Sequence, residues 1–151
     1  MDRRDFLRAT GMSVVGSAVF ASLQESMFAS PPPPHVAWVE NGEPAQLLAA
    51  AVKEFGGMQK FISRGDVVVV KPNMGWDRAP QYAANTNPDL VAALVRECLN
   101  AGAKTVKVFD RTCNNPLRCY TNSQVEASAR DAGADVSHIR ETRFVTKSVN
   151  G

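Results

Sequence analysis

Apolar runs and turn-forming residues alternate along the chain from position 35 onward, and their periods predict strands and helices in turn. The clearest apolar run is Val67–Val70, four consecutive valines between Gly65-Asp66 and Pro72-Asn73. A run without polar alternation is typical of a strand that is buried on both faces in the middle of a parallel sheet. Because proline has no amide hydrogen to give to a ladder, the strand is predicted to stop before Pro72.

Two stretches carry apolar residues at helical spacing. The first has Pro44 in its first turn and ends at Gly56-Gly57, and the second has Thr86 or Asn87 as its cap and Pro88 at its first position. The apolar stripes are Leu47, Leu48, Ala51, Val52 and Phe55 in the first, and Leu90, Val91, Leu94, Val95, Cys98 and Leu99 in the second. Both stretches are predicted to pack one face on a sheet.

Three further strands are predicted, at residues 35–39, 104–109 and 135–139, and Ser123-Gln124-Val125-Glu126 forms a capping box that opens a third helix. The step from helix stop to strand occurs twice, 31 residues apart, at Ala101-Gly102-Ala103-Lys104 and Ala132-Gly133-Ala134-Asp135. This distance is typical of one βα unit. The predicted fold is therefore α/β, a three-layer Rossmann-like domain with a mostly parallel sheet of about four strands and right-handed crossovers.

The first 30 residues follow a different pattern, that of a removable signal peptide. Arg3-Arg4-Asp5-Phe6-Leu7-Arg8 has the form of a twin-arginine signal, and an uncharged, weakly apolar stretch follows it at residues 9–24. That stretch is too short and too polar to span a bilayer, so we expect cleavage rather than a permanent membrane span. The expected location is periplasmic or otherwise exported, with the twin-arginine export machinery as a partner. Residues 31–35 form a proline-rich spacer and residues 36–151 the α/β domain.

Length and charge narrow the classes of function. The chain has 151 residues, 44% of them hydrophobic, and is expected to hold one modest domain. Removal of residues 1–30 takes away three basic and three acidic side chains, so the formal net charge of +2 is unchanged. This balance gives no argument for nucleic acid as a partner, and no basic run indicates a membrane surface.

Polar residues follow two of the predicted strands at their carboxyl ends. Lys71 and Asn73 follow the valine strand, and Asp110 and Arg111 follow the strand at 104–109. Because the carboxyl ends of parallel strands open onto one crevice, these residues predict a site for a small anionic or polar ligand. Alternatively, Lys71 pairs with Asp110 to satisfy two strand ends, and Asn73 closes a turn. No Gly-x-Gly-x-x-Gly or Walker motif follows a strand, so a nucleotide is not specifically indicated.

The cysteines and histidines give further candidates. Cys98 lies in an apolar stripe and is predicted to be a buried thiol. Cys113 and Cys119 flank a polar loop, and in an oxidising compartment a disulfide between them is favoured. Free thiols, or ligation of a metal or an iron–sulfur cluster, remain the alternatives, although ferredoxin-type spacing is missing. His35 and His138 have no second ligand at metal spacing and are expected to be packing or surface residues.

Three segments occur in order at βα-unit spacing: 65–73 (Gly-Asp-Val-Val-Val-Val-Lys-Pro-Asn), 86–91 (Thr-Asn-Pro-Asp-Leu-Val) and 101–104 (Ala-Gly-Ala-Lys) with its strand ending in Asp110. On these segments the chain resembles the uncharacterised family called domain of unknown function 362, over roughly residues 36–140. Members of that family are usually about twice this length; several look twin-arginine exported, and others are joined to ferredoxin-type iron–sulfur modules. The resemblance implies an exported α/β protein of which this chain looks like the amino-terminal half.

Three hypotheses of function follow. The first is an exported domain that binds a small ligand above the carboxyl ends of the strands. The second is a redox or metal-dependent enzyme in which Cys113 and Cys119 hold or contact an iron–sulfur cluster or another metal cofactor. The third is an incomplete fragment whose apolar sheet edge needs missing sequence or a partner subunit to cover it.

Overall fold

The computed structural model describes residues 36–149, and in this part of the chain three strands form one parallel sheet. The strands are β1 (Val67–Val70), β2 (Thr105–Val108) and β3 (Asp135–Val136), in the spatial order β1-β2-β3. Their registers pair Val68 with Val106 and Val108 with Val136. The predicted α/β fold and parallel sheet are confirmed. The expected signal peptide and spacer lie outside the described residues.

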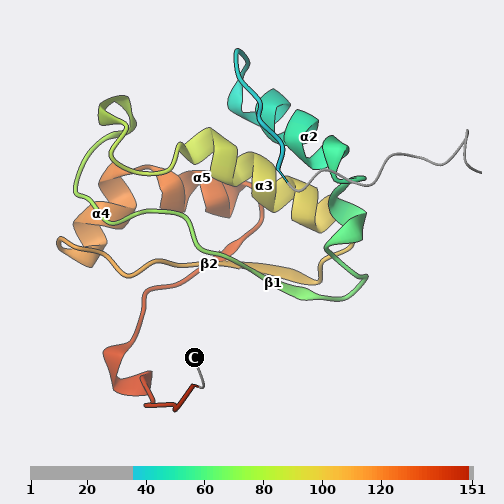
Figure 1. Cartoon of the computed structure of the whole chain (residues 1–151). Helices are drawn as coiled ribbons and strands as arrows, with labels where there is room; N and C mark the ends of the chain where they lie inside the picture. Colours follow the sequence, from blue (N-terminus) through green and yellow to red (C-terminus); the bar gives the residue numbers. More distant parts are fainter. Residues whose placement is uncertain (1–35, 150–151) are drawn as a thin grey trace, which may run out of the picture. The chain divides into compact units, whose positions relative to one another are not determined.

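Among residues 36–149, four helices accompany the sheet. They are α2 (Pro44–Glu54), α3 (Pro88–Asn100), α4 (Pro116–Asn122) and α5 (Val125–Asp131), with 3-10 turns η1 (Met58–Lys60), η2 (Pro80–Tyr82) and η3 (Glu141–Arg143). α3 packs against α2, α5 and β2, and α5 packs against β3. Figure 1 shows α2, α3 and α5 on the same side of the sheet. Residues 36–149 thus show one helical layer over one sheet, two of the three layers expected. None of their helices is long and apolar enough to cross a membrane.

The best-predicted helix, α3, is positioned by its first residues and by its buried face. The side chain of Asn87 accepts hydrogen bonds from the amides of Asp89 and Leu90, and Pro88 occupies the first position. These contacts satisfy amides that have no partner within the helix. The face that includes Val91 and Val95 is buried against the sheet. The cap is therefore Asn87 and not Thr86.

The position of the valine strand corrects one prediction. β1 lies at an edge of the sheet rather than in its middle, and the side chains of Val67 and Val69 are 57% and 55% exposed. The reason is that, within residues 36–149, β1 pairs with β2 alone and has helices over one face only. Another prediction was wrong as well: a strand was expected at residues 35–39, and residues 36–39, the part of it that the structure describes, form no strand.

The chain between β2 and β3 corrects two more predictions. The segment between Cys113 and Cys119, expected to be a polar loop, contains the start of α4 (Pro116–Asn122), which is capped by the side chain of Asn115. The expected capping box at 123–126 is absent: Ser123 instead ends α4, and its hydroxyl donates to the Tyr120 carbonyl oxygen at 3.2 Å. α5 then begins after Gln124, which has a φ of 60° and no capping side-chain hydrogen bond. The side chain of Ser123 therefore bonds to the end of α4 and does not form a capping box at the start of α5.

The core lies between the sheet and the helices that cover it. Val106 and Val108 of β2, Val95 of α3 and Val125 of α5 have no exposed surface. Closely packed interiors of this kind hold their boundary residues in place. The loops that leave β2 and β3 therefore start from the buried core of the domain.

Candidate functional site

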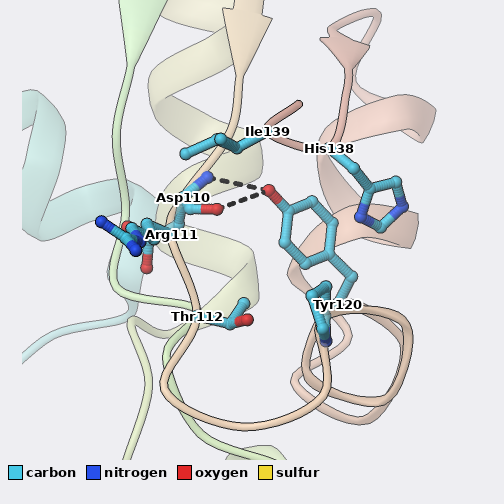
Figure 2. A pocket seen from close by; sticks show the side chains of 7 residues that line it. Asp110, Arg111, Thr112, Tyr120, His138 and Ile139 are labelled. Atoms are coloured by element: carbon cyan, nitrogen blue, oxygen red, sulfur yellow. Dashed lines mark hydrogen bonds between the residues drawn. The ribbon is translucent and has the colours of Figure 1, made fainter. Parts of the chain in front are cut away.

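A cavity of about 230 Å³ opens at the carboxyl ends of β2 and β3 (Figure 2). Its walls come from the loop after β2, the beginning of α4 and the loop after β3. The lining side chains are those of Asp110, Arg111, Thr112, Tyr120, His138 and Ile139, with Pro116 at the start of α4. The sequence analysis places Asp110 and Arg111 at this edge, and both line the cavity.

Tyr120 of α4 joins the two strand ends beneath the cavity. Its hydroxyl oxygen accepts a hydrogen bond from the Asp110 amide at 2.9 Å, and its proton faces the carbonyl oxygens of Asp110 at 2.9 Å and Ser137 at 3.2 Å. Burial raises the pKa of Tyr120 above its ordinary value of 10.0, which keeps the phenol protonated and able to donate. The ring also stacks on His138, with centroids 4.2 Å apart. Tyr120 therefore fixes the shape of this wall.

The Asp110 carboxylate is buried, and both of its oxygens have protein partners. One oxygen accepts from the Met74 amide at 2.8 Å, and the other lies 2.6 Å from Lys71 Nζ. The Lys71 side chain is 64% exposed, so the pair has one buried and one solvated end. Of the two interpretations drawn from the sequence, the structure contains the pairing of Lys71 with Asp110. Asp110 thus ties β1 to β2 at the edge of the cavity.

Asn73 lies away from the cavity and closes a turn. Its side-chain oxygen accepts from the Gly75 amide at 2.9 Å, and its amide nitrogen donates to the Ala84 carbonyl at 3.2 Å. Its backbone amide and carbonyl are both bonded to Thr86. Lys71 and Asn73 are thus engaged with the protein itself, and neither lines the cavity.

Three further polar residues line the cavity: Arg111, Thr112 and His138. Unlike Asp110 and Tyr120, they do not link the ends of two strands. The guanidinium of Arg111 lies 5.6 Å from the centroid of the Phe144 ring, and the Thr112 hydroxyl donates to the Asn114 carbonyl at 2.7 Å. The sequence analysis did not assign His138 or Thr112 to a site. The position of His138 directly after a strand was the available signal, because the same rule selects Asp110.

The cysteines are free thiols in the structure, so the disulfide favoured between Cys113 and Cys119 is not formed there. The Cys119 thiol is buried and donates to the Gly75 carbonyl at 3.4 Å, which also accepts from the amide of the exposed Cys113. Cys98 is buried as predicted, and burial raises the pKa of both Cys98 and Cys119. Residues 36–149 contain no group of three or more His, Cys, Asp or Glu side chains that could hold a metal ion.

Comparison with known proteins gives one match. The sequence model of a family described as domain of unknown function (DUF362) matches residues 68–151, more than half of the chain. The matched part begins within β1 and includes β2, β3 and every residue that lines the cavity. No curated protein and no solved structure matches the chain.

Proposed function

Since the chain belongs to the DUF362 family, whose description assigns no activity, we propose its function from the geometry of the cavity. The protein is an exported α/β domain that binds a small anionic or polar ligand at the carboxyl ends of β2 and β3. The observation that carries this proposal is the cavity between two strand-end loops, lined by Arg111, Thr112 and His138. Open α/β sheets bind their ligands outside the carboxyl ends of their strands.

The size of the cavity favours a small ligand. Sites for drug-sized molecules enclose roughly 300–1,000 Å³, whereas this one encloses about 230 Å³. Inorganic anions and small carboxylic acids fit such a volume. Tyr120 and Ile139 supply apolar surface, so a ligand with a short carbon skeleton is also accommodated.

The charges around the cavity favour an anion. Arg111 lines the cavity, and a guanidinium group can bind a carboxylate or phosphate with two hydrogen bonds. The negative charge of Asp110 is offset by Lys71 Nζ at 2.6 Å, so it repels an anion only weakly. His138 and Thr112 add polar groups beside Arg111, which suits a ligand with several oxygen atoms.

A titration followed residue by residue tests the proposal. The ¹⁵N-labelled protein is titrated separately with phosphate, sulfate and citrate, and we expect at least one of these to shift the amide signals of Arg111, Thr112 and His138 in a saturable way. Arg111→Ala is expected to weaken binding by roughly 10- to 100-fold, because a charge-assisted hydrogen bond contributes about 1.5–3 kcal/mol. Arg96→Ala is the matched control, since it removes the same charge from the exposed side of α3. Equal affinities of the two variants would refute the assignment.

The export part of the proposal is supported by the twin-arginine pattern at residues 3–8. Its test is the location of the full chain in a bacterium with a working twin-arginine pathway. Arg3→Lys combined with Arg4→Lys is expected to retain the protein in the cytoplasm, because the pathway reads the arginine pair. Lys53→Arg is a control that leaves the pair intact. Export of the double variant at the level of the unmodified protein would contradict this part of the proposal.

A further inference from the structure

A second cavity, of about 610 Å³, lies between the loop after β1 and α4. Figure 1 shows this loop beside α4, and the lining residues lie within 77–82 of the loop and within 118–124, which covers α4 and the turn that follows it. None of these residues lines the cavity at the carboxyl ends of β2 and β3. Sites for drug-sized molecules enclose roughly 300–1,000 Å³, so this second cavity has room for a larger ligand than the first.

Asp77 joins the two walls of this cavity. One oxygen of its carboxylate lies 2.7 Å from a guanidinium nitrogen of Arg118, and the other accepts a hydrogen bond from the side-chain amide of Asn122. The backbone amide of Asp77 donates to the side-chain oxygen of Asn114 at 3.2 Å. The Asp77 side chain is only 15% exposed, so its charge is both paired and largely buried. Asp77 therefore holds the loop on α4 and adds little negative potential to the cavity.

Two arginines give the cavity a positive charge. Arg78 and Arg118 are both exposed, and Asp77 is the only acidic residue among the described residues that line the cavity. Arg78 donates from one guanidinium nitrogen to the Asp77 carbonyl oxygen at 2.8 Å, and Arg118 pairs with the Asp77 carboxylate. A guanidinium has five N–H donors, so each arginine can still donate to a ligand. This arrangement suits a carboxylate or a phosphate, which arginine binds with two parallel hydrogen bonds.

An aromatic ring lines the same cavity. Tyr82 is the last residue of η2 and is 67% exposed. Its position is fixed by the turn, which begins at Pro80 and in which the Tyr82 amide donates to the Ala79 carbonyl at 3.1 Å. The face of an aromatic ring is electron-rich and attracts the C–H groups on the flat face of a sugar ring. Tyr82 therefore offers a stacking surface beside the two arginines.

Uncharged polar residues complete the wall on the side of α4: Thr121, Asn122 and Gln124. Amide and hydroxyl side chains both donate and accept hydrogen bonds, as sugar hydroxyls do. The nitrogen of the Asn122 side chain donates to Asp77, and its oxygen can accept from a ligand. Gln124 is exposed in the turn between α4 and α5, where its φ is 60°. These groups match a ligand that has several hydroxyls as well as an acidic group.

Two other classes of ligand would use this cavity less fully. An inorganic anion would occupy the arginines but leave the ring and the amide side chains without contacts. Nucleotide phosphates are commonly bound by glycine-rich loops at the start of a helix, whereas residues 77–82 contain no glycine. A sugar with an acidic group would contact the arginines, the ring and the amides together.

We propose that this cavity binds a sugar that carries a carboxylate or phosphate group. Arg78 and Arg118 bind the acidic group, Tyr82 stacks on the face of the sugar ring, and the uncharged polar residues on the side of α4 bind its hydroxyls. The site shares no lining residue with the cavity at the carboxyl ends of β2 and β3, so its test is independent of the function proposed for that cavity.

Amide signals of the ¹⁵N-labelled full-length chain locate and measure the binding. Glucuronate and glucose 6-phosphate are titrated separately, and glucose and inorganic phosphate each supply one part of the same chemistry. We expect at least one of the two sugar acids to shift the signals of Tyr82, Thr121 and Gln124 in a saturable way. Glucose and phosphate are expected to bind there at least about tenfold more weakly, because each lacks one set of contacts. The tighter of the two sugar acids identifies the acidic group as carboxylate or phosphate.

Substitutions test the individual contacts. Tyr82→Ala removes the ring and is expected to weaken binding of the sugar acid by about three- to tenfold, whereas Tyr82→Phe keeps the ring and should retain most of the affinity. Arg78→Gln is expected to weaken binding by about tenfold, because a charge-assisted hydrogen bond is lost. Arg96→Gln is the matched control, since it removes the same charge from the exposed side of α3.

Four results would overturn the proposal. The first is the absence of saturable shifts at Tyr82, Thr121 and Gln124 with both sugar acids, including shifts confined to the cavity at the carboxyl ends of β2 and β3. The second is equal affinity for glucose and for its acids, which would exclude a role for the arginines. The third is tighter binding of AMP than of either sugar acid, which would make the ligand a nucleotide. The fourth is unchanged affinity in Tyr82→Ala, in a protein that remains folded.

Discussion

Two loops leave the sheet at the carboxyl ends of β1 and β2, and they use their polar residues differently. In the loop after β1, the side chains of Asn73 and Asn85 form hydrogen bonds with the backbone of the same loop. The side-chain oxygen of Asn85 accepts from the Trp76 amide, and its nitrogen donates to the carbonyl oxygens of Trp76 and Arg78. In the loop after β2, the Asp110 carboxylate instead accepts from the Met74 amide of the other loop, and Arg111 lines a cavity. Polar residues at the ends of neighbouring strands thus either bond to the loop backbone or line the cavity.

The difference follows from the length of each loop. Between β1 and α3 the chain runs from residue 71 to residue 87 with only the 3-10 turn η2 inside it. Its backbone groups cannot all pair within regular structure, so side chains of asparagine and threonine satisfy them. The chain between β2 and α4 is shorter, and α4 pairs most of the backbone that follows. Arg111 and Thr112 lie in this short stretch and line the cavity.

The largest expected effect is the loss of the link between the two loops. Asp110→Ala removes the acceptor of the buried Met74 amide and the partner of Lys71. A buried donor without a partner costs about 1–3 kcal/mol, and the lost ion pair adds to this, so we expect the free energy of unfolding to fall by about 3 kcal/mol. Urea denaturation measures it. Asp110→Asn keeps an acceptor and should cost less; equal losses would show that charge rather than hydrogen bonding dominates.

Tyr120→Phe is expected to have the next largest effect. It removes the hydroxyl that accepts from the Asp110 amide and donates toward the loop after β3, in a fully buried position. The expected loss is about 2 kcal/mol in the free energy of unfolding, because at least one buried backbone group is left without a partner. Tyr82→Phe is the matched control, since Tyr82 is exposed. Equal free energies of unfolding of the two variants would show that the Tyr120 hydroxyl does not connect β2 and β3.

Lys71→Met should affect stability less and binding only moderately. The lysine side chain is mostly solvated, so the expected loss of stability is about 1 kcal/mol. The charge of Asp110 would then be uncompensated beside the cavity, and an anion should bind a few-fold more weakly at low salt. Calorimetric titration at two ionic strengths measures this. A loss as large as that of Arg111→Ala would mean that Lys71 contacts the ligand directly.

The smallest effect concerns the buried thiols at alkaline pH. Burial raises the pKa of Cys98 and Cys119 from the ordinary value of 9.0, so above that pH the unfolded chain releases protons that the folded chain retains. The free energy of unfolding is therefore highest, as far as these thiols affect it, below pH 9. It declines as the pH rises through 9 toward the raised pKa of the folded state. Unfolding curves at pH 8 and pH 10 should show a smaller decline in Cys98→Ala. In the folded protein, iodoacetamide should modify the exposed Cys113 first.

The sequence was sufficient for α3 and β2, because each is specified by residues close together in the chain. Asn87 and Pro88 begin α3, and a single apolar stripe fixes its buried face. The position of β1 at the edge of the sheet could not be predicted from local sequence, because a run of four valines does not indicate which strands lie beside it. Sheet order depends on contacts between segments that are far apart in sequence, and local patterns do not contain it.

The site could be predicted only in part, because some of its residues follow a strand directly and others come from distant segments. Arg111 and Asp110 follow a well-predicted strand, and the rule of carboxyl ends selects them. Tyr120 was missed because α4 was taken for loop, although Asn115-Pro116 repeats the Asn-Pro start of α3. The partners of Lys71 and Asn73 are backbone groups as well as side chains, and no residue pattern distinguishes such partners from a ligand.

The most direct test of the account compares one residue from each loop in a single titration. Citrate, phosphate and sulfate are titrated by calorimetry into the unmodified protein, Arg111→Ala and Asn73→Ala. For an anion that binds, Arg111→Ala is predicted to raise the dissociation constant by at least about tenfold, and Asn73→Ala is predicted to leave it unchanged in a protein that stays folded. Equal losses in both variants, or a loss in Asn73→Ala alone, would contradict the division between a structural and a binding loop.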